Sequence, residues 1–180
     1  MYFLVDHENV NNSGYQGVEY LLPEDTIEIF YSESSKNIHN GIFRLIKDSG
    51  CDIKICKLTQ VRKNALDFYI VCRLGELIGS GYQGNSAIIS GDHGFKSVQE
   101  YWRNCTKHKR RIGLALSVAD AIIAMNEPVS RTGEVKMQMK PAPSSSKRLI
   151  KPLQKSAVST MQQTLMTKEP LSTATIKIFY

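Results

Sequence analysis

The chain has 180 residues, of which 42% are hydrophobic and 22% are charged, a balance that supports a folded core and excludes disorder over the whole chain. No apolar run reaches the roughly 18–20 residues that a membrane span needs, and the N-terminus lacks a signal-peptide pattern, so we expect a cytoplasmic protein without membrane contact. The net charge of +6 divides into −4 over residues 1–100 and +10 over residues 101–180, which indicates an acidic body with a basic end that attracts polyanions.

Short apolar, β-rich runs alternate along the chain with segments whose apolar residues recur every three or four positions. The first pattern predicts strands and the second predicts amphipathic helices. In chain order we expect a strand at 2–5, a short helix at 18–22, a strand at 26–31, a helix at 38–50, a strand at 51–58, a helix at 66–78, a strand at 87–89, a helix at 95–105, a strand at 112–116 and a helix at 118–125.

This alternation predicts one α/β domain over residues 1–127, with a doubly wound, mainly parallel, five-stranded sheet of the Rossmann-like kind. Right-handed crossovers favour the strand order 3-2-1-4-5. Residues 128–180 are rich in Pro, Ser and Lys, and seven basic residues lie between Arg131 and Lys155. We expect this segment to be a flexible, disordered basic tail that binds nucleic acid or a protein partner. Its last five residues, 176–180, have the composition of a strand.

Three aspartates stand where the predicted strands end. Asp6 follows the first strand, Asp92 follows the fourth, and Asp67 lies in the first turn of the helix entered from the third. Ligands of open α/β sheets bind outside the carboxyl ends of the strands, near the point where strand order reverses. We therefore expect the three carboxylates to face one crevice. Further polar residues are expected in the same loop layer: Glu8, Asn9, Glu33 and Asp120.

Carboxylates brought this close repel one another, and a divalent cation removes the conflict. Oxygen ligands without a Cys or His partner favour Mg²⁺ or Mn²⁺. Such ions hydrolyse phosphodiesters by activating water and by neutralising the charge that develops on the phosphate. The aspartates thus predict a metal-dependent phosphodiesterase site.

Each aspartate also has a purely structural explanation. Asn64 and Asp67 are spaced as a helix N-cap and its capping acid, Asp92 is placed to cap a helix that begins near Gly94, and Asp6 is a suitable turn former. Capping is common enough to explain any one of them. Their convergence at one edge of the sheet is what favours a site.

Three segments resemble motifs of the NYN branch of the PIN-like nucleases: VDHENV at residues 5–10, LDFYIV at 66–71 and ISGDHGF at 89–95. They occur in the family's order, and the resemblance covers about residues 1–120. It implies a PIN-like fold and a Mg²⁺- or Mn²⁺-dependent endoribonuclease that acts on RNA. It also implies that Asp6, Asp67 and Asp92 are the metal ligands, with Asn9 supporting the site.

Two positions depart from the family pattern. Gly94 stands where many relatives have a second aspartate, and Leu66 stands where some have a paired acid. A fourth carboxylate would have to come from Glu8, Glu33 or Asp120, and no motif selects among these. A second hypothesis is therefore a degenerate PIN-like module that binds nucleic acid or acts as a scaffold without cutting.

Basic residues flank the acidic motifs and precede the last predicted strand. They are candidates for phosphate contacts that give salt-sensitive binding, although a charge run is also typical of a solvated loop. The candidates are Arg62, Lys63, Lys96, Lys107, Lys109, Arg110 and Arg111.

Other side chains near the motifs suggest further contacts. His93 is placed to assist proton transfer or is a surface histidine. Tyr15, Tyr31 and Tyr82 adjoin loops and are candidates for stacking on unpaired bases. The pattern is compatible with a homo-oligomer. It contains no phosphate-binding P-loop, dinucleotide fingerprint or hydrolase elbow.

Overall fold

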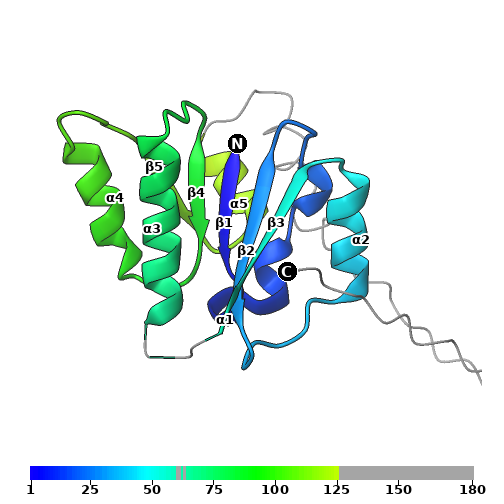
Figure 1. The fold of residues 1–180 in the computed structure, drawn as a ribbon. Helices are drawn as coiled ribbons and strands as arrows, with labels where there is room; N and C mark the ends of the chain where they lie inside the picture. The colour runs from blue at the N-terminus through cyan, green and yellow to red at the C-terminus, as the bar shows by residue number, and fades with distance from the viewer. Residues whose placement is uncertain (60–61, 63, 126–180) are drawn as a thin grey trace, which may run out of the picture. The chain divides into compact units, whose positions relative to one another are not determined.

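The computed structural model describes residues 1–59, 62 and 64–125, and Figure 1 shows its ribbon. The strands are β1 (Tyr2–Asp6), β2 (Thr26–Ser32), β3 (Asp52–Leu58), β4 (Ser86–Ile89) and β5 (Ile112–Ala115). They form one sheet in the order β3-β2-β1-β4-β5, in which each neighbouring pair is parallel. The predicted α/β class and strand order are thereby confirmed.

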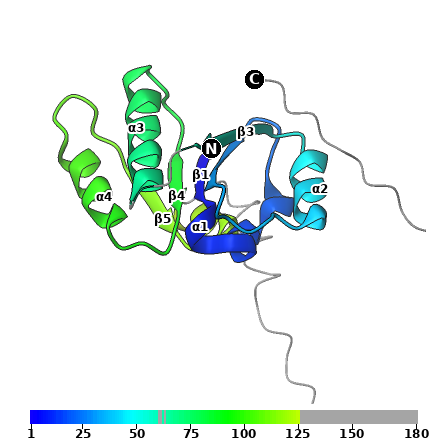
Figure 2. The same ribbon diagram turned by 60° about the horizontal axis from the view of Figure 1, so that its bottom comes forward.

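Helices cover both faces of the sheet (Figures 1 and 2). One face carries α3 (Ala65–Gly79) and α4 (Phe95–Asn104), and the other carries α2 (Asn40–Asp48) and α5 (Val118–Ala124). Side chains alternate along each strand, so Tyr2 and Leu4 of β1 pack under α3 while Phe3 and Val5 pack in the opposite core. This period-two separation of the faces is what the strand pattern predicts.

The segment after β1 differs from the prediction. It contains the short helix α1 (His7–Val10) and the 3-10 helices η1 (Asn11–Tyr15) and η2 (Val18–Tyr20), of which only the last was expected. One helical turn is too short to produce a recognisable period in the sequence. The side chain of Asp6 accepts a hydrogen bond from the backbone N–H of Asn9 at 3.3 Å and so caps α1.

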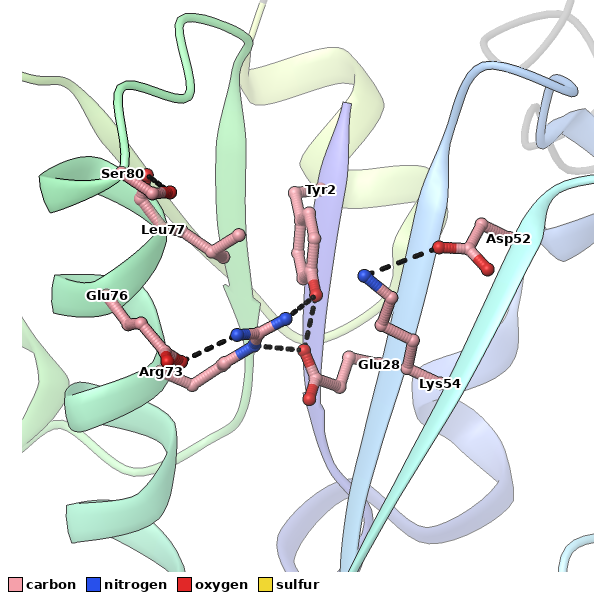
Figure 3. Close-up of polar contacts among 8 residues, drawn as sticks. All are labelled: Tyr2, Glu28, Asp52, Lys54, Arg73, Glu76, Leu77 and Ser80. Atoms are coloured by element: carbon pink, nitrogen blue, oxygen red, sulfur yellow. Dashed lines mark hydrogen bonds and ion pairs between the residues drawn. The ribbon is translucent and has the colours of Figure 1, made fainter.

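A polar cluster on the sheet fixes the position of α3 (Figure 3). Arg73 of α3 donates through Nε to Glu28 Oε2 at 2.9 Å, through Nη1 to Glu76 Oε2 at 2.6 Å and through Nη2 to the Tyr2 hydroxyl at 3.2 Å. Tyr2 also donates to Glu28. Because Glu28 is buried in a central strand, leaving it without its cation would cost about 3–5 kcal/mol. The cluster therefore holds α3 against the sheet and brings the first turn of α3, with Asp67, to the carboxyl edge.

Within the described part of the chain, no helix is both long enough and apolar enough to cross a membrane. The predicted basic tail and the predicted strand at 176–180 lie outside the described residues, as does Lys63.

Candidate active site

Acidic side chains meet at the carboxyl edge of the sheet, next to the point where strand order reverses. Asp6 at the end of β1, Asp67 in α3 and Asp92 in the loop after β4 line one cavity of about 260 Å³. Glu8 and Asn9 of α1 line the same cavity. With Arg62, which also lines it, six of the site residues predicted from the sequence are brought together from three separate parts of the chain. We call this space the acidic cavity.

Asp6 lies at the buried end of the acidic cavity and is 3% exposed. Its Oδ2 accepts a hydrogen bond from the Ser90 hydroxyl at 2.9 Å. Burial raises the pKa of Asp6 above its usual value, the hydrogen bonds from Ser90 and Asn9 oppose this, and the charges of Asp67 and Glu8 raise the pKa further. The carboxylates thus act on one another through space.

Asp67 contributes a carboxylate from the first turn of α3. Burial raises its pKa, and the charges of Asp92 and Glu8 add to the rise. Asn64 precedes the helix with a φ of 61° and makes no side-chain capping bond to it. The structure therefore does not support the capping explanation of this Asn–Asp spacing. It shows instead that the Asp67 carboxylate lies near the negative charges of Asp92 and Glu8.

Asp92 combines a structural role with its place in the cavity. Its Oδ1 accepts from the backbone N–H of Gly94 at 2.7 Å, and its own N–H donates to Ser90 Oγ at 3.0 Å. Ser90 accordingly joins Asp92 to Asp6. Sequence reasoning gave Ser90 no role, although the Ser-Gly-Asp segment contained it.

Two contacts anchor α1 beside the acids. Asn9 Oδ1 accepts from the backbone N–H of Gly91 at 2.8 Å, and a Cβ at position 91 would lie 2.9 Å from that oxygen, so a larger residue there would displace the Asn9 amide from this position. The carboxylate of Glu8 accepts hydrogen bonds from hydroxyl groups at the end of β2 and in the loop that follows. These are Ser32, Ser34 and Ser35.

The other acidic candidates lie elsewhere. Glu33 forms an exposed ion pair with Lys57 at 3.1 Å, and Asp120 accepts from the Ser117 hydroxyl at 2.7 Å within the cap of α5. Neither lines the acidic cavity, and His93 does not line it either. The expectation that Glu33 and Asp120 share the crevice therefore does not hold, and Glu8 is the additional acid at the cavity.

The basic candidates are divided between two ends of the sheet. Arg62 lines the acidic cavity, and Lys96 is exposed on α4. The run at Lys107, Lys109, Arg110 and Arg111 precedes β5, so in a parallel sheet it lies at the amino edge, away from the acids. Its last three cations line a separate cavity with Arg103.

The aromatic residues near the acids are not the predicted ones. Tyr15 is buried, with its hydroxyl 3.1 Å from His7 Nδ1, and Tyr82 packs edge-on against Tyr2 at 5.8 Å between ring centroids. None of the three predicted tyrosines, Tyr15, Tyr31 and Tyr82, lines the acidic cavity. Phe68, which follows Asp67 directly, is instead 67% exposed. Sequence reasoning missed it because its segment was interpreted only as a helix with an acid.

The donor chemistry of the acidic cavity suits a hard cation. The candidate ligands are carboxylate and amide oxygens, which Mg²⁺ and Mn²⁺ prefer. In the described residues, no group of three or more His, Cys, Asp or Glu side chains is close enough to hold a metal ion by itself. Mg²⁺ sites commonly use one or two carboxylates and complete their coordination with water and phosphate, so this donor set fits a site of that water-rich kind.

Comparisons with known proteins agree with this arrangement. Residues 1–112 match the family model of the PIN domain, a span that runs from β1 to the start of β5 and includes every residue named above as lining the acidic cavity. Neither the curated proteins nor the solved structures provide a match. PIN domains are generally nucleases and generally use divalent metals. From its sheet order, the position of its acids and the matched span, the chain belongs to the PIN domain family.

Proposed function

We propose that this PIN domain is a Mg²⁺- or Mn²⁺-dependent endoribonuclease of the NYN branch, which hydrolyses RNA phosphodiesters at the acidic cavity. One observation carries the proposal: Asp6, Asp67 and Asp92 come from separate elements and line one cavity of about 260 Å³. The pKa values of Asp6 and Asp67 are raised partly by the neighbouring acids. A bound cation offsets the repulsion among these carboxylates. Carboxylates that served only as helix caps would need no cation.

Asp6, Asp67 and Asp92 are the residues that would hold the metal, and Glu8 and Asn9 would support them. When bound, the ion supplies an activated water and neutralises charge on the phosphate. The volume of the cavity leaves room for the waters that Mg²⁺ retains.

The protein's own contribution is to orient these groups. Ser90 fixes Asp6 by donating to Oδ2 and fixes the Asp92 backbone by accepting its N–H. Arg62 lines the acidic cavity and is placed to pair with a phosphate oxygen. Partners of this kind, behind the ligands, commonly affect metal affinity or activity by 10–100-fold.

Recruitment of RNA is assigned to the basic residues outside the cavity. Lys96 and the run from Lys107 to Arg111 carry the charge, and Lys63 and the tail at 128–180 add to it. Because Lys107–Arg111 lies at the amino edge of the sheet, we expect it to attract RNA over a distance and not to contact the cleaved phosphate. Its contribution should fall as salt rises.

Cleavage of a panel of single-stranded and structured RNAs by the full chain tests this function. We expect activity with Mn²⁺ or Mg²⁺, none in EDTA, and recovery when Mn²⁺ is restored. Asp6→Asn and Asp92→Asn should each lose more than about 100-fold, since changes behind the ligands already cost 10–100-fold. Asp48→Asn makes the same substitution at an exposed position of α2 and should leave the rate unchanged. Full activity in both cavity variants would exclude the proposal.

A non-catalytic nucleic-acid-binding or scaffold module is the second candidate. It is favoured by Gly94, where many relatives have another acid, and by the lack of a preformed three-ligand group among the described residues. This candidate predicts RNA binding that is unchanged in EDTA, with no cleavage of any substrate. Cleavage that is lost on chelation and regained with Mn²⁺ rules it out.

A further inference from the structure

A second hollow, of about 340 Å³, adjoins the acidic cavity between α3 and α4. The two spaces share Asn64, Asp67 and Asp92 as lining residues. The remaining wall of this α3–α4 hollow is mostly apolar and includes Phe68, Val71 and Val98. Its volume is at the small end of the range for ligand pockets, about 300–1,000 Å³.

Phe68 gives this hollow an aromatic surface that the core does not explain. Leu66 and Ile70 of α3 are buried against the sheet, whereas Phe68 is 67% exposed, more than any other large hydrophobic side chain in the described part of the chain. Aromatic faces of this kind stack on bases of single strands.

The charges around the hollow restrict what can occupy it. Asp67 and Asp92 form its boundary with the acidic cavity, and they repel anionic groups. An uncharged, planar group is therefore the best match to an apolar wall with an exposed ring. A nucleobase has these properties, and its own phosphate backbone would place it next to the acidic cavity.

We propose that the α3–α4 hollow receives an unpaired nucleobase, stacked on Phe68, from the RNA strand whose phosphodiester lies in the acidic cavity. This rests on the proposed function and narrows its substrate class to single-stranded or looped RNA, because a base inside a duplex is already paired and stacked. Asn64 borders both spaces and makes no capping bond to α3. Its amide is placed to hydrogen-bond the edge of the base.

The larger groove on the other side of α3 does not suit this role. It is lined by Phe68 and Tyr69 but also by Glu28, Arg73 and Glu76. The guanidinium of Arg73 is already paired with the two glutamates and the Tyr2 hydroxyl (Figure 3). No cation of that cluster is left to hold a phosphate, and the groove shares no acid with the acidic cavity.

A double-mutant cycle, which combines substitution of Phe68 with removal of single bases from the RNA, tests whether a base stacks on Phe68. Affinity of the full chain is measured for a short single-stranded RNA and for a series in which each base in turn is removed to leave an abasic sugar. Ca²⁺ replaces Mn²⁺, and the RNA is checked for integrity after each titration. In the wild type, one abasic position should weaken binding about ten-fold, the size of one base–aromatic stack. In Phe68→Ala, the intact RNA should bind about ten-fold more weakly, and that position should lose its effect.

Control variants separate stacking from general loss of structure. Phe43→Ala removes an exposed phenylalanine from α2 and should leave the abasic profile unchanged. Phe68→Tyr should restore binding, while Phe68→Leu, which is apolar without a π-face, should not. Equal affinity of Phe68→Ala and wild type, or additive effects of the two substitutions, would overturn the proposal. The measurement is RNA binding, so the abasic effect can be observed even if the protein does not cleave RNA, which would contradict only the proposed nuclease function. Conversely, cleavage by a protein in which Phe68→Ala does not change the abasic profile would contradict only the base-binding proposal.

Discussion

Asn9 Oδ1 accepts the backbone N–H of Gly91 at 2.8 Å, and this bond ties the turn after β1 to the turn after β4. Asp6 is the last residue of β1 and Asp92 lies in the loop after β4, and Ser90 also links these two aspartates. The two strands are neighbours in the sheet, so the contact sets how the loops beyond them meet. It is a contact between side chain and backbone across more than eighty residues of sequence.

Loss of this tie should reduce activity more than stability. Asn9→Ala leaves the Gly91 N–H without its partner, which costs about 1–3 kcal/mol when the group is removed from water and less at this exposed loop. We expect a cleavage rate about 10–100-fold lower and a thermal midpoint only a few degrees lower. Asn37→Ala, at an exposed position outside the acidic cavity, is the control. An unchanged rate for Asn9→Ala would contradict the role of this bond.

The same contact predicts how Gly91→Ala behaves. The added Cβ would lie 2.9 Å from Asn9 Oδ1 and 3.4 Å from Leu116 Cδ2, so either the Asn9 amide or the loop must shift. Gly91→Ala should lower the cleavage rate of the wild type. In the Asn9→Ala variant the same substitution should have a much smaller effect, because the Asn9 Oδ1 that the Cβ would crowd is absent. A double-mutant cycle on the rate measures this coupling, and additive losses would show that the residues act separately.

Neutralising Asp67 should stabilise the metal-free protein while abolishing cleavage. The pKa of Asp67 is raised by burial and by the charges of Asp92 and Glu8, so the folded state disfavours its ionised form. The resulting cost is present at neutral pH and disappears as pH falls below the unfolded value of about 4. Asp67→Asn should therefore raise the thermal midpoint by a few degrees at pH 7 and by almost nothing near pH 3.

Thermal melts of Asp67→Asn and Asp48→Asn in EDTA provide this comparison. Asp48 is exposed and lies outside the acidic cavity, so its variant should show no comparable gain. A lower midpoint for Asp67→Asn at neutral pH would mean that the carboxylate stabilises the fold, as a cap would.

Divalent ions should stabilise the wild type without any RNA present. A ligand that binds only the folded state adds about 2.7 kcal/mol at 100 times its Kd. The thermal midpoint should rise with Mn²⁺ concentration for the wild type. It should not change for the double variant that combines Asp6→Asn with Asp67→Asn. Equal shifts in both proteins would place the bound ion outside the acidic cavity.

Alkaline pH tests the cluster that positions α3. Burial and the hydrogen bond to Glu28 raise the pKa of Tyr2, which Arg73 opposes. A group whose folded pKa is raised contributes stability that is complete below its unfolded pKa, about 10 for tyrosine, and is lost as pH rises further. Tyr2→Phe should therefore cost about 1–3 kcal/mol at pH 7, and its deficit should shrink above pH 10.

Denaturant unfolding of Tyr2→Phe across this pH range is the measurement. Tyr69→Phe removes a hydroxyl from a tyrosine that is 51% exposed and should follow the wild type at every pH. A deficit of Tyr2→Phe that stays constant above pH 10 would show that the Tyr2 proton does not contribute to stability.

The local sequence determined the elements and the edge of the sheet at which the acids lie. The β-rich composition of residues 26–31 and the apolar spacing from Leu66 to Ile78 are properties of neighbouring residues, and both appear as the expected strand and helix. Asp6 and Asp92 follow parallel strands, so topology alone places them at one edge. The position of Lys107–Arg111 before β5 follows from the same rule.

Tertiary structure decided which side chains share a space. Glu8 and Glu33 are equivalent in the sequence pattern, but the serines after β2 hold Glu8 at the acidic cavity while Lys57 pairs with Glu33 outside it. The exposure of Phe68 and the burial of Tyr15 likewise depend on what packs beside them. These outcomes are set by contacts between residues distant in the chain, and neither periodicity nor composition carries information about such contacts.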